Sequence, residues 1–340
     1  NRLVWMETDN TYPYRNLAME EYMTLHVPRG PCILYLWQNR HTVVIGKNQN
    51  CWRECRVNFL EQEDGYLVRR LSGGGAVFHD LGNLNFTFIV GAGDYDVSRQ
   101  LDVILEAVRS LGIHAEKTGR NDITVDGRKF SGNAFYRTGD GCYHHGTILI
   151  RADKENMSRY LNVSKEKLAS KGVTSVKSRV ANLCEFKPDI TLEEVKSALV
   201  EAFSKVYGQP AVRMEEGELP QPDIDARTEK FAYWQWKYGR KIPFEYEMEK
   251  RFPWGNIQIQ FHVDEGMIQD VNVFSDAMDQ EMIGMLAEQL KGCAYAEEDI
   301  CRAVKAVGTD AFQAGEYTGA DEPQSCRIKE DIMTLVRESL

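Results

Sequence analysis

The chain has 340 residues, of which 43% are hydrophobic and 27% are charged, and its formal net charge at pH 7 is −10. This composition is typical of a globular protein of two domains, and it lacks the concentrated positive charge of a nucleic-acid-binding protein. No apolar run approaches the roughly 18 residues that a helix needs to cross a bilayer, so no membrane-spanning helix is expected.

The cysteines and the N-terminal residues bear on the cellular compartment. The eight cysteines are scattered along the chain, which favours reduced thiols over disulfides or a zinc site. The N-terminal NRLVWMETDN lacks the basic-then-apolar layout of a secretory signal. Together these features predict a cytoplasmic protein, with an organelle matrix as the other compatible compartment.

Strands are predicted at 32–38 (CILYLWQ), 41–47 (HTVVIGK) and 82–90 (GNLNFTFIV), and between the last two lies the segment RRLSGGGAVF. Each glycine of this run costs roughly 1 kcal/mol in a regular element, so we expect its backbone to approach another group closely. A strand bulge or a tight corner is one interpretation. The two adjacent arginines favour the other, a loop that binds a phosphate or a carboxylate.

Two helices have clear boundaries. The segment 98–112 (SRQLDVILEAVRSLG) has one apolar face, with Ser98 as the expected N-cap and Gly112 at its end. A second helix is predicted from Thr191, which forms a capping box with Glu194, to the glycine at 208.

The segment 121–151 predicts a three-stranded antiparallel meander, because the pairs Asp126–Gly127 and Asp140–Gly141 are strong hairpin signals. A two-residue first turn pairs Thr124 with Lys129 and Asp122 with Ser131. Alternation then gives one polar and one apolar face. The polar face comprises Asp122, Thr124, Lys129, Ser131 and Asn133, and the apolar face comprises Ile123, Val125 and Phe130.

Several residues here keep an alternative interpretation. Lys129 is either part of this polar face or a surface lysine on an edge strand. His144 and His145 are either a proton-transfer pair or ordinary strand residues, and the second is favoured because no carboxylate or metal spacing accompanies them.

Residues 209–225 are polar and contain prolines, which indicates a surface excursion rather than a domain break. A strand pattern restarts after Trp234 and Trp236, which we interpret as packing residues. A hairpin (IQIQFHV, turn DEG, MIQDVNVF) and three amphipathic helices follow. We therefore expect two domains, 1–245 and 246–340.

The sequence resembles the lipoate–protein ligase A family in three blocks, in order and at matching separations. These are RRLSGGGAVFHDLGNLNFTF, GRNDITVDGRKFSGNAFYRTGDGCYHHGTILI and KLASKGVTSVKSRVANL. The resemblance extends over essentially the whole chain. It implies an α+β fold, with a mixed-sheet catalytic domain like that of biotin ligases and class II synthetases and a small α+β accessory domain.

The resemblance also implies a reaction. Lipoate, and also octanoate, would react with ATP and Mg²⁺ to give an acyl-adenylate and pyrophosphate. A lysine of an acceptor lipoyl domain, in an E2 subunit of a 2-oxoacid dehydrogenase or in the glycine cleavage H protein, would then attack it. It implies a monomer with neither a nucleic-acid partner nor a membrane partner.

The resemblance assigns roles to individual residues, with Lys129 as the catalytic residue that contacts both the lipoyl carbonyl and the α-phosphate. ATP and the acyl-adenylate would be bound by Arg70, Gly75, Ala76, Val77, Phe78, Asn121 and Asp122, the last through Mg²⁺. Lipoate would be bound by Ser72, Gly73, Gly74, His79, Asn83, Lys129, His145 and Gly146. A loop with Lys171, Gly172, Val173, Val176 and Ser178 would close over the adenylate.

Two other functions stay open. One is a cysteine-dependent octanoyl or lipoyl transferase that needs no ATP, for which Cys142 and Cys184 are candidates without an obvious base beside them. The other is a non-catalytic module that binds lipoate or lipoyl proteins.

Overall fold

The computed structural model describes residues 2–26, 32–118, 122–162, 179–308 and 324–340. They form two compact units. The large unit comprises Asn1–Val44, Cys51–Arg69 and Ala76–Lys237, and the small unit comprises Ile45–Asn50, Arg70–Gly75 and Tyr238–Leu340. Among the described residues, no helix combines the length and the apolar character needed to cross a membrane.

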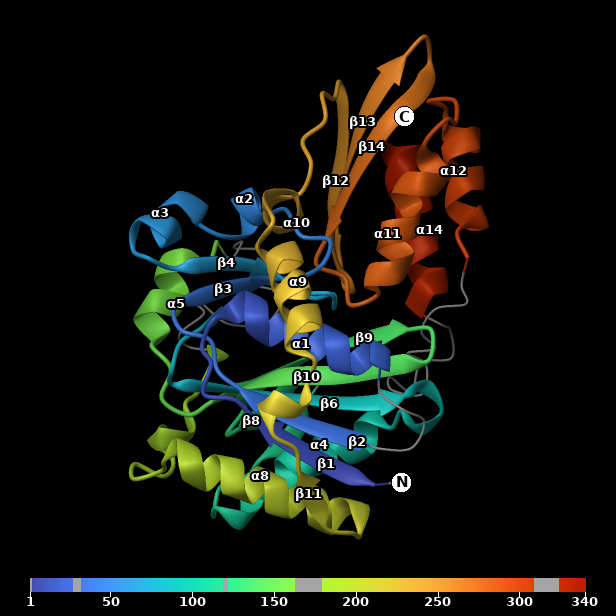
Figure 1. Cartoon of the computed structure of the whole chain (residues 1–340). Coiled ribbons are helices and arrows are strands. Elements are labelled where there is room, and N and C mark those ends of the chain that lie inside the picture. The colour runs from blue at the N-terminus through green and yellow to red at the C-terminus, as the bar shows by residue number, and fades with distance from the viewer. Residues whose placement is uncertain (1, 27–31, 119–121, 163–178, 309–323) are drawn as a thin grey trace. The chain divides into compact units, whose positions relative to one another are not determined.

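An eight-stranded mixed sheet forms the centre of the large unit (Figure 1), with strand order β11-β1-β2-β6-β10-β9-β8-β7. β11, β1 and β2 are parallel, whereas the remaining neighbours are antiparallel. The strands are β1 Leu3–Glu7, β2 Cys32–Trp37, β6 Asn83–Gly91, β7 Glu116–Thr118, β8 Asp122–Val125, β9 Arg128–Thr138, β10 Gly141–Leu149 and β11 Ala211–Arg213. A second sheet has the order β4-β3-β5, with β3 Thr42–Ile45, β4 Tyr66–Arg69 and β5 Val77–His79. The predicted mixed-sheet α+β architecture is confirmed.

Helices cover both faces of the eight-stranded sheet. The helices are α1 Pro13–His26, α2 Cys51–Glu54, α3 Val57–Gln62, α4 Val97–Ser110, α5 Lys154–Tyr160, α8 Leu192–Tyr207, α9 Gln221–Ala232 and α10 Trp234–Tyr238. α4 and α8 lie on one face and α1 lies on the other (Figure 1). Contacts agree with this arrangement, since Phe203 of α8 packs on Phe88 of β6 and Glu20 of α1 bonds His145 of β10.

Helix capping differs from the prediction in one case. The N-cap of α4 is Asp96, whose carboxylate accepts a hydrogen bond from Arg99 N at 2.9 Å, so the choice of Ser98 was wrong. Asp96 is the N-cap because its carboxylate stands three residues before the Arg99 amide, the spacing at which an N-cap side chain accepts a hydrogen bond. The capping box of Thr191 and Glu194 is confirmed, and α8 ends at Gly208 with φ 72°.

The 209–225 segment contains regular structure that sequence reasoning missed. β11 adds a short parallel edge strand beside β1, and α9 begins at Gln221. The β-strand is only three residues long and α9 starts within a polar stretch, so neither carried a clear periodic signal.

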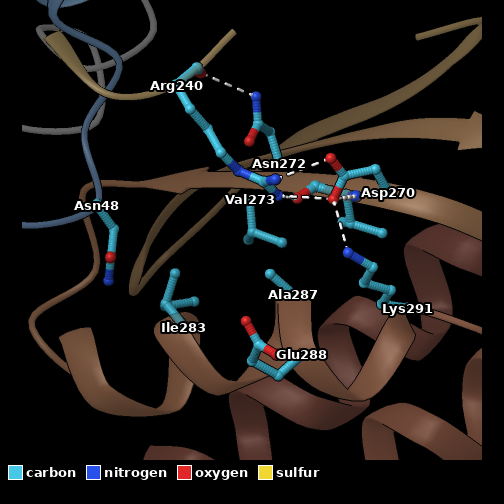
Figure 2. Close-up of a pocket in the computed structure, with 11 residues that line it drawn as sticks. Asn48, Arg240, Asp270, Asn272, Val273, Ile283, Ala287, Glu288 and Lys291 are labelled. Atoms are coloured by element: carbon cyan, nitrogen blue, oxygen red, sulfur yellow. Dashed lines mark hydrogen bonds and ion pairs between the residues drawn. The ribbon is translucent and has the colours of Figure 1, made fainter. Parts of the chain in front are cut away.

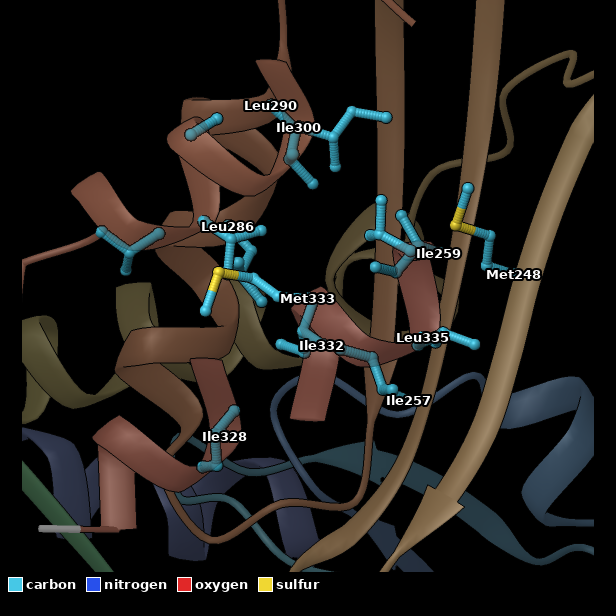
Figure 3. Close-up of a cluster of buried hydrophobic side chains, with 14 of the residues drawn as sticks. Met248, Ile257, Ile259, Leu286, Leu290, Ile300, Ile328, Ile332, Met333 and Leu335 are labelled. Atoms are coloured by element: carbon cyan, nitrogen blue, oxygen red, sulfur yellow. The ribbon is translucent and has the colours of Figure 1, made fainter. Parts of the chain in front are cut away.

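The small unit has its own hydrophobic core, in which a three-stranded sheet packs against helices (Figure 3). Its elements are β12 Tyr246–Phe252, β13 Gly255–Asp264, β14 Met267–Ser275, α11 Gln280–Leu290, α12 Glu297–Ala306 and α14 Gln324–Ser339. The predicted hairpin is confirmed, with positive φ at Glu265 (48°) and Gly266 (76°) in its turn. The described helices after it number three, as expected, whereas β12 was missed.

Candidate active site

The meander β8-β9-β10 positions the predicted catalytic lysine. Its first turn has positive φ at Asp126 (50°) and Gly127 (72°), and the predicted pairing of Thr124 with Lys129 is confirmed. The second turn lies one residue earlier than predicted. Thr138 pairs with Gly141, and Gly139 takes the positive φ (40°), so the Asp140–Gly141 assignment was wrong. The turn needs a residue with positive φ, which glycine adopts at little cost. Gly139 fills this position, whereas the prediction assigned it to Gly141.

A β-bulge changes the rest of the register. β9 contains one extra residue between Lys129 and Ser131, so Asp122 pairs with Gly132 and the predicted pairing with Ser131 was wrong. Paired residues share a face of the sheet, and the bulge shifts the alternation. Lys129 therefore lies on the face of Asp122, Thr124 and Gly132. Ser131 and Asn133 lie on the opposite face, so the predicted row of five polar residues is broken.

Lys129 and Asp122 form a partly buried ion pair that Arg179 completes. Lys129 Nζ lies 2.5 Å from Asp122 Oδ1, and Arg179 donates to Asp122 Oδ2 at 2.9 Å. Burial by itself would raise the pKa of Asp122, but Lys129 first and Arg179 second outweigh it and hold that pKa below its ordinary value. The carboxylate stays ionised and fixes the lysine ammonium in place.

The chain after residue 178 is anchored to the same strand. Val180 forms an isolated parallel bridge with Lys129, and Ala181 N donates to Lys129 O at 2.9 Å. Asn182 then exchanges two hydrogen bonds of 2.9 Å with the backbone of Ala152. Sequence reasoning did not single out Arg179. The predicted closing-loop residues Lys171, Gly172, Val173, Val176 and Ser178, together with Asn121, lie outside the described residues.

The surroundings of Asp122 do not fit a resident metal ion. Both carboxylate oxygens face cations, from Lys129 and from Arg179. Within the described part of the chain, no group of three or more histidine, cysteine, aspartate or glutamate side chains could hold a metal. A magnesium ion there would have to displace a cation from the carboxylate.

On the Lys129 face, a buried chain of hydrogen bonds reaches His145. His145 Nδ1 and Glu20 Oε1 are 2.8 Å apart, and Thr87 Oγ1 donates to the same oxygen at 2.7 Å. Trp37 Nε1 donates to Thr87 Oγ1 at 3.0 Å. Sequence reasoning missed Glu20, Thr87 and Trp37. Only Glu20 had a signal in the sequence, because it is a glutamate on the buried side of α1.

Two more predicted lipoate-binding residues, His79 and Asn83, lie near these hydrogen bonds in the large unit. The ring of His79 packs edge-on against Trp37 at 6.4 Å, and its Nδ1 is 3.3 Å from Asn39 Nδ2. Asn83 donates to Asn85 Oδ1 at 2.9 Å on the face that carries Thr87. The Nδ2 of Asn85 is fully buried and has no partner within the described chain, which leaves a polar donor on this face.

His144 lies on the opposite face, so the two adjacent histidines do not face each other. It is fully buried, with Nε2 at 2.8 Å from Asn133 and Nδ1 at 3.1 Å from Gln100. Burial, followed by the neighbouring His145, lowers its pKa well below the usual value, and the ring is neutral. Gly146 shares this face, and an added Cβ there would lie 2.6 Å from Phe86 and 2.7 Å from Gly132 O.

The glycine run belongs to the small unit and packs against the backbone of another segment of that unit. Gly74 has φ 88° and donates its N–H to Ala277 O at 3.0 Å. A Cβ on Gly73 would lie 2.5 Å from Ala277 O and 2.6 Å from Met278 O. The close approach expected from the sequence is therefore present, and its partner in this structure is another segment of the chain.

Both arginines beside this run are buried against carbonyl groups. Arg70 donates to Ser72 Oγ, Gly73 O and Gly75 O, at 2.7 to 3.2 Å. Arg69 instead donates to the carbonyls of Trp236 and Lys237. Burial lowers the pKa of Arg69 to about 10. Arg70 thus shapes the glycine loop, whereas Arg69 caps α10.

The remaining residues of the block belong to the large unit. Ala76 and Val77 are half-buried, and Val77 pairs with Val44. The ring of Phe78 is 2% exposed and packs on Tyr160 and His41, so its side chain belongs to the core.

The small unit also contains a cavity of about 260 Å³ between β14 and α11 (Figure 2). Arg240 forms a two-pronged ion pair with Asp270 at its edge, at 2.8 Å for both contacts. Ile283, Ala287 and Glu288 point into it from α11 (Figure 2). None of the residues predicted to bind ATP or lipoate lines this cavity.

Comparisons with known proteins agree on one family. Residues 12–204 match the model of the lipoyl protein ligase A/B catalytic domain, and residues 241–319 match that of the bacterial lipoate protein ligase C-terminus. The chain is similar to Lipoate-protein ligase A of Psychrobacter cryohalolentis, with 41% identity over 298 residues that cover 85% of this chain and 88% of that protein.

Solved structures give the same result for the fold. P. falciparum LipL1 in complex with lipoate has a TM-score of 0.83 and 29% identity, and the match covers 98% of this chain and 99% of that one. The bipartite lipoate protein ligase of Thermoplasma acidophilum has a TM-score of 0.60 and 26% identity, and the match covers 71% of this chain and 98% of that one. The predicted fold is confirmed, and the chain belongs to the lipoate–protein ligase A family.

Proposed function

We propose that this chain condenses free lipoate with ATP to give lipoyl-AMP and pyrophosphate, and then transfers the lipoyl group to a lysine of an acceptor lipoyl domain. The observation that carries the proposal is the ion pair of Lys129 with Asp122, which holds an ammonium on a mostly buried sheet face. The family assignment makes the chain a lipoate ligase, and the adenylate step is the part that we propose.

Lys129 would act through its charge in both steps. A carboxylate and a triphosphate repel each other, so a cation between them stabilises the negative charge that develops at phosphorus. In transfer, the same ammonium would polarise the lipoyl carbonyl and offset the charge on the departing AMP. We propose no nucleophilic role for Lys129, because its ammonium is held in an ion pair with Asp122.

Arg70, Gly75, Ala76, Val77, Phe78, Asn121 and Asp122 are proposed to contribute to nucleotide binding. For Phe78 the contribution would come from its backbone, because its ring is buried. We propose that Mg²⁺ arrives with ATP, held by phosphate oxygens, because both oxygens of Asp122 already face cations.

The proposed lipoate-binding residues are Ser72, Gly73, Gly74, His79, Asn83, Lys129, His145 and Gly146. The LipL1 structure, described as a complex with lipoate, supports this substrate. Octanoate, which has the same carboxylate and an alkyl chain of similar length, is a proposed second substrate.

The proposed acceptors are apo lipoyl domains of 2-oxoacid dehydrogenase E2 subunits and the glycine cleavage H protein. The Thermoplasma acidophilum ligase is described together with its E2 lipoyl domain, which supports an E2 acceptor. We further propose a monomer in the cytoplasm. The eight free thiols are compatible with that reducing compartment.

A cysteine-dependent transferase is the competing function. Burial raises the pKa of Cys142 to about 11, which opposes formation of a thiolate nucleophile at neutral pH. Lipoate-dependent ATP–pyrophosphate exchange separates the two, because a transferase that works through a thioester would show none.

The test uses this exchange and, separately, transfer from supplied lipoyl-AMP to each acceptor. We expect wild-type protein to catalyse both. Lys129→Ala should lose about 100- to 1000-fold in each, the usual effect of removing one preorganised electrostatic group. Lys129→Arg should recover only part of the rate, because a planar guanidinium does not reproduce a point-like ammonium. Wild-type protein without lipoate-dependent exchange, or an alanine variant with wild-type rates, would refute the proposal.

A further inference from the structure

We propose that Gly132 is a positioning residue for Lys129, and that its missing side chain determines where the lysine ammonium lies. The proposal rests on the role proposed above for Lys129. Gly132 was not among the residues assigned to a site from the sequence.

Gly132 is not required by the backbone. Its φ lies outside the left-handed region that favours glycine. Glycine within a strand weakens the strand and commonly marks a close approach by another group. Here the approaching group is Lys129, because a Cβ on Gly132 would lie 2.6 Å from Lys129 Nζ and 2.7 Å from Lys129 Cε.

The bulge explains how residues three positions apart meet. In a regular strand the side chains of residues i and i+3 point to opposite faces. The extra residue between Lys129 and Ser131 returns Lys129 to the face of Gly132 and of its partner Asp122. The lysine side chain therefore crosses Gly132, and its ammonium ends at the Asp122 carboxylate.

The surrounding backbone is fixed, so an added methyl group would move the lysine. Gly132 N donates to Thr147 Oγ1 at 3.2 Å, and Lys129 O accepts from Ala181 N at 2.9 Å. The atoms that an added Cβ would meet, Lys129 Nζ and Cε, instead lie at the far end of a flexible side chain. Alanine at 132 is thus expected to displace the ammonium at little cost to folding.

The first test is Gly132→Ala in otherwise intact protein. We expect an unchanged or slightly raised Tm, and a loss of about 10- to 100-fold in kcat for exchange and for transfer, as a displacement near 1 Å produces. In the Lys129→Ala background the same substitution should change the rates less than about twofold, because residues that act as one unit are not additive. A crystal structure of Gly132→Ala should show Nζ moved away from Asp122.

Two alanine variants serve as controls. Gly217→Ala adds a methyl group with no atom within 4 Å, and it should change neither Tm nor rate. Gly146→Ala meets backbone and a buried ring, and it should lower Tm.

Three results would overturn the proposal. They are a Tm loss in Gly132→Ala like that of Gly146→Ala, full additivity with Lys129→Ala, and an unmoved Nζ in the crystal structure. If wild-type protein shows no exchange, the proposed function fails, while the position of Nζ still decides the role of Gly132.

Discussion

At the scale of single residues, local sequence predicted the strand partner of Lys129, but it did not predict the residues that the bulge and the fold bring close to it. The Asp126–Gly127 turn is a local signal, and it gave the correct pairing of Thr124 with Lys129. The bulge that follows has no local signature, so the neighbour of Asp122 was misassigned. Arg179 and Gly132 were missed for a related reason, since their roles depend on contacts that the fold creates.

His144 gives a testable pH dependence. Because its pKa is lowered well below the usual value, the folded protein leaves it neutral where the unfolded chain binds a proton. Below the unfolded pKa of about 6.5, the free energy of unfolding should fall by up to about 1.4 kcal/mol per pH unit from this group. His144→Gln should be less stable at pH 7.5 but should lose less stability between pH 6.5 and 5. Denaturant unfolding across this range measures both effects.

The control for this experiment is His26→Gln, since His26 is exposed on the last turn of α1. It makes the same substitution at a histidine that is not buried, so it controls for the exchange of an imidazole for an amide. A His144→Gln slope that matches wild type would show that the folded protein protonates His144.

At the scale of elements, the glycine loop shows what a sequence pattern leaves undecided. Three consecutive glycines correctly predicted a close approach. They could not identify the approaching group, which in this structure is the backbone at Ala277 and Met278. Ligand binding by the same loop stays a proposal. Contacts of this kind join segments about 200 residues apart, so no local pattern encodes them.

Gly73→Ala should destabilise the protein by about 1–3 kcal/mol, the typical cost of overpacking a tight site. The added Cβ would lie 2.5 Å and 2.6 Å from two carbonyl oxygens, and backbone atoms cannot rotate away as a side chain can. Chemical denaturation measures the cost. Faster hydrogen exchange at the Gly74 amide, which donates to Ala277 O, would show that the destabilisation arises at this contact.

Gly284→Ala is the matched control, because Gly284 lies within α11 and an added Cβ meets no atom within 4 Å. Alanine is favoured over glycine in a helix by about 1 kcal/mol, so this variant should be as stable as wild type or more so. If Gly73→Ala were equally stable, the packing described for the glycine loop would be wrong.

At the scale of the whole molecule, the sequence was sufficient for the α+β class and the family. It did not reveal that the small unit is discontinuous and includes Ile45–Asn50 and Arg70–Gly75 as well as the C-terminal residues. Asn48 Nδ2 donates to Gln280 O at 2.7 Å, and Ser275 N donates to Asn48 O at 2.9 Å. The two short segments and the C-terminal residues thus form one packed structure, which makes the C-terminal residues a support for the glycine loop.

Removal of residues 246–340 should therefore impair adenylate formation more than transfer from supplied lipoyl-AMP. The truncated chain retains Lys129 and Asp122 in the large unit, but its glycine loop loses the Ala277 carbonyl that accepts from Gly74. We expect the fragment 1–245 to show faster hydrogen exchange at 45–50 and 70–75 than the full chain, and ATP–pyrophosphate exchange reduced at least about 100-fold. Transfer should fall by a smaller factor, and adding 246–340 as a separate chain should restore part of the exchange. Circular dichroism must first show that the fragment is folded, and equal losses in both steps by a folded fragment would contradict this division of roles.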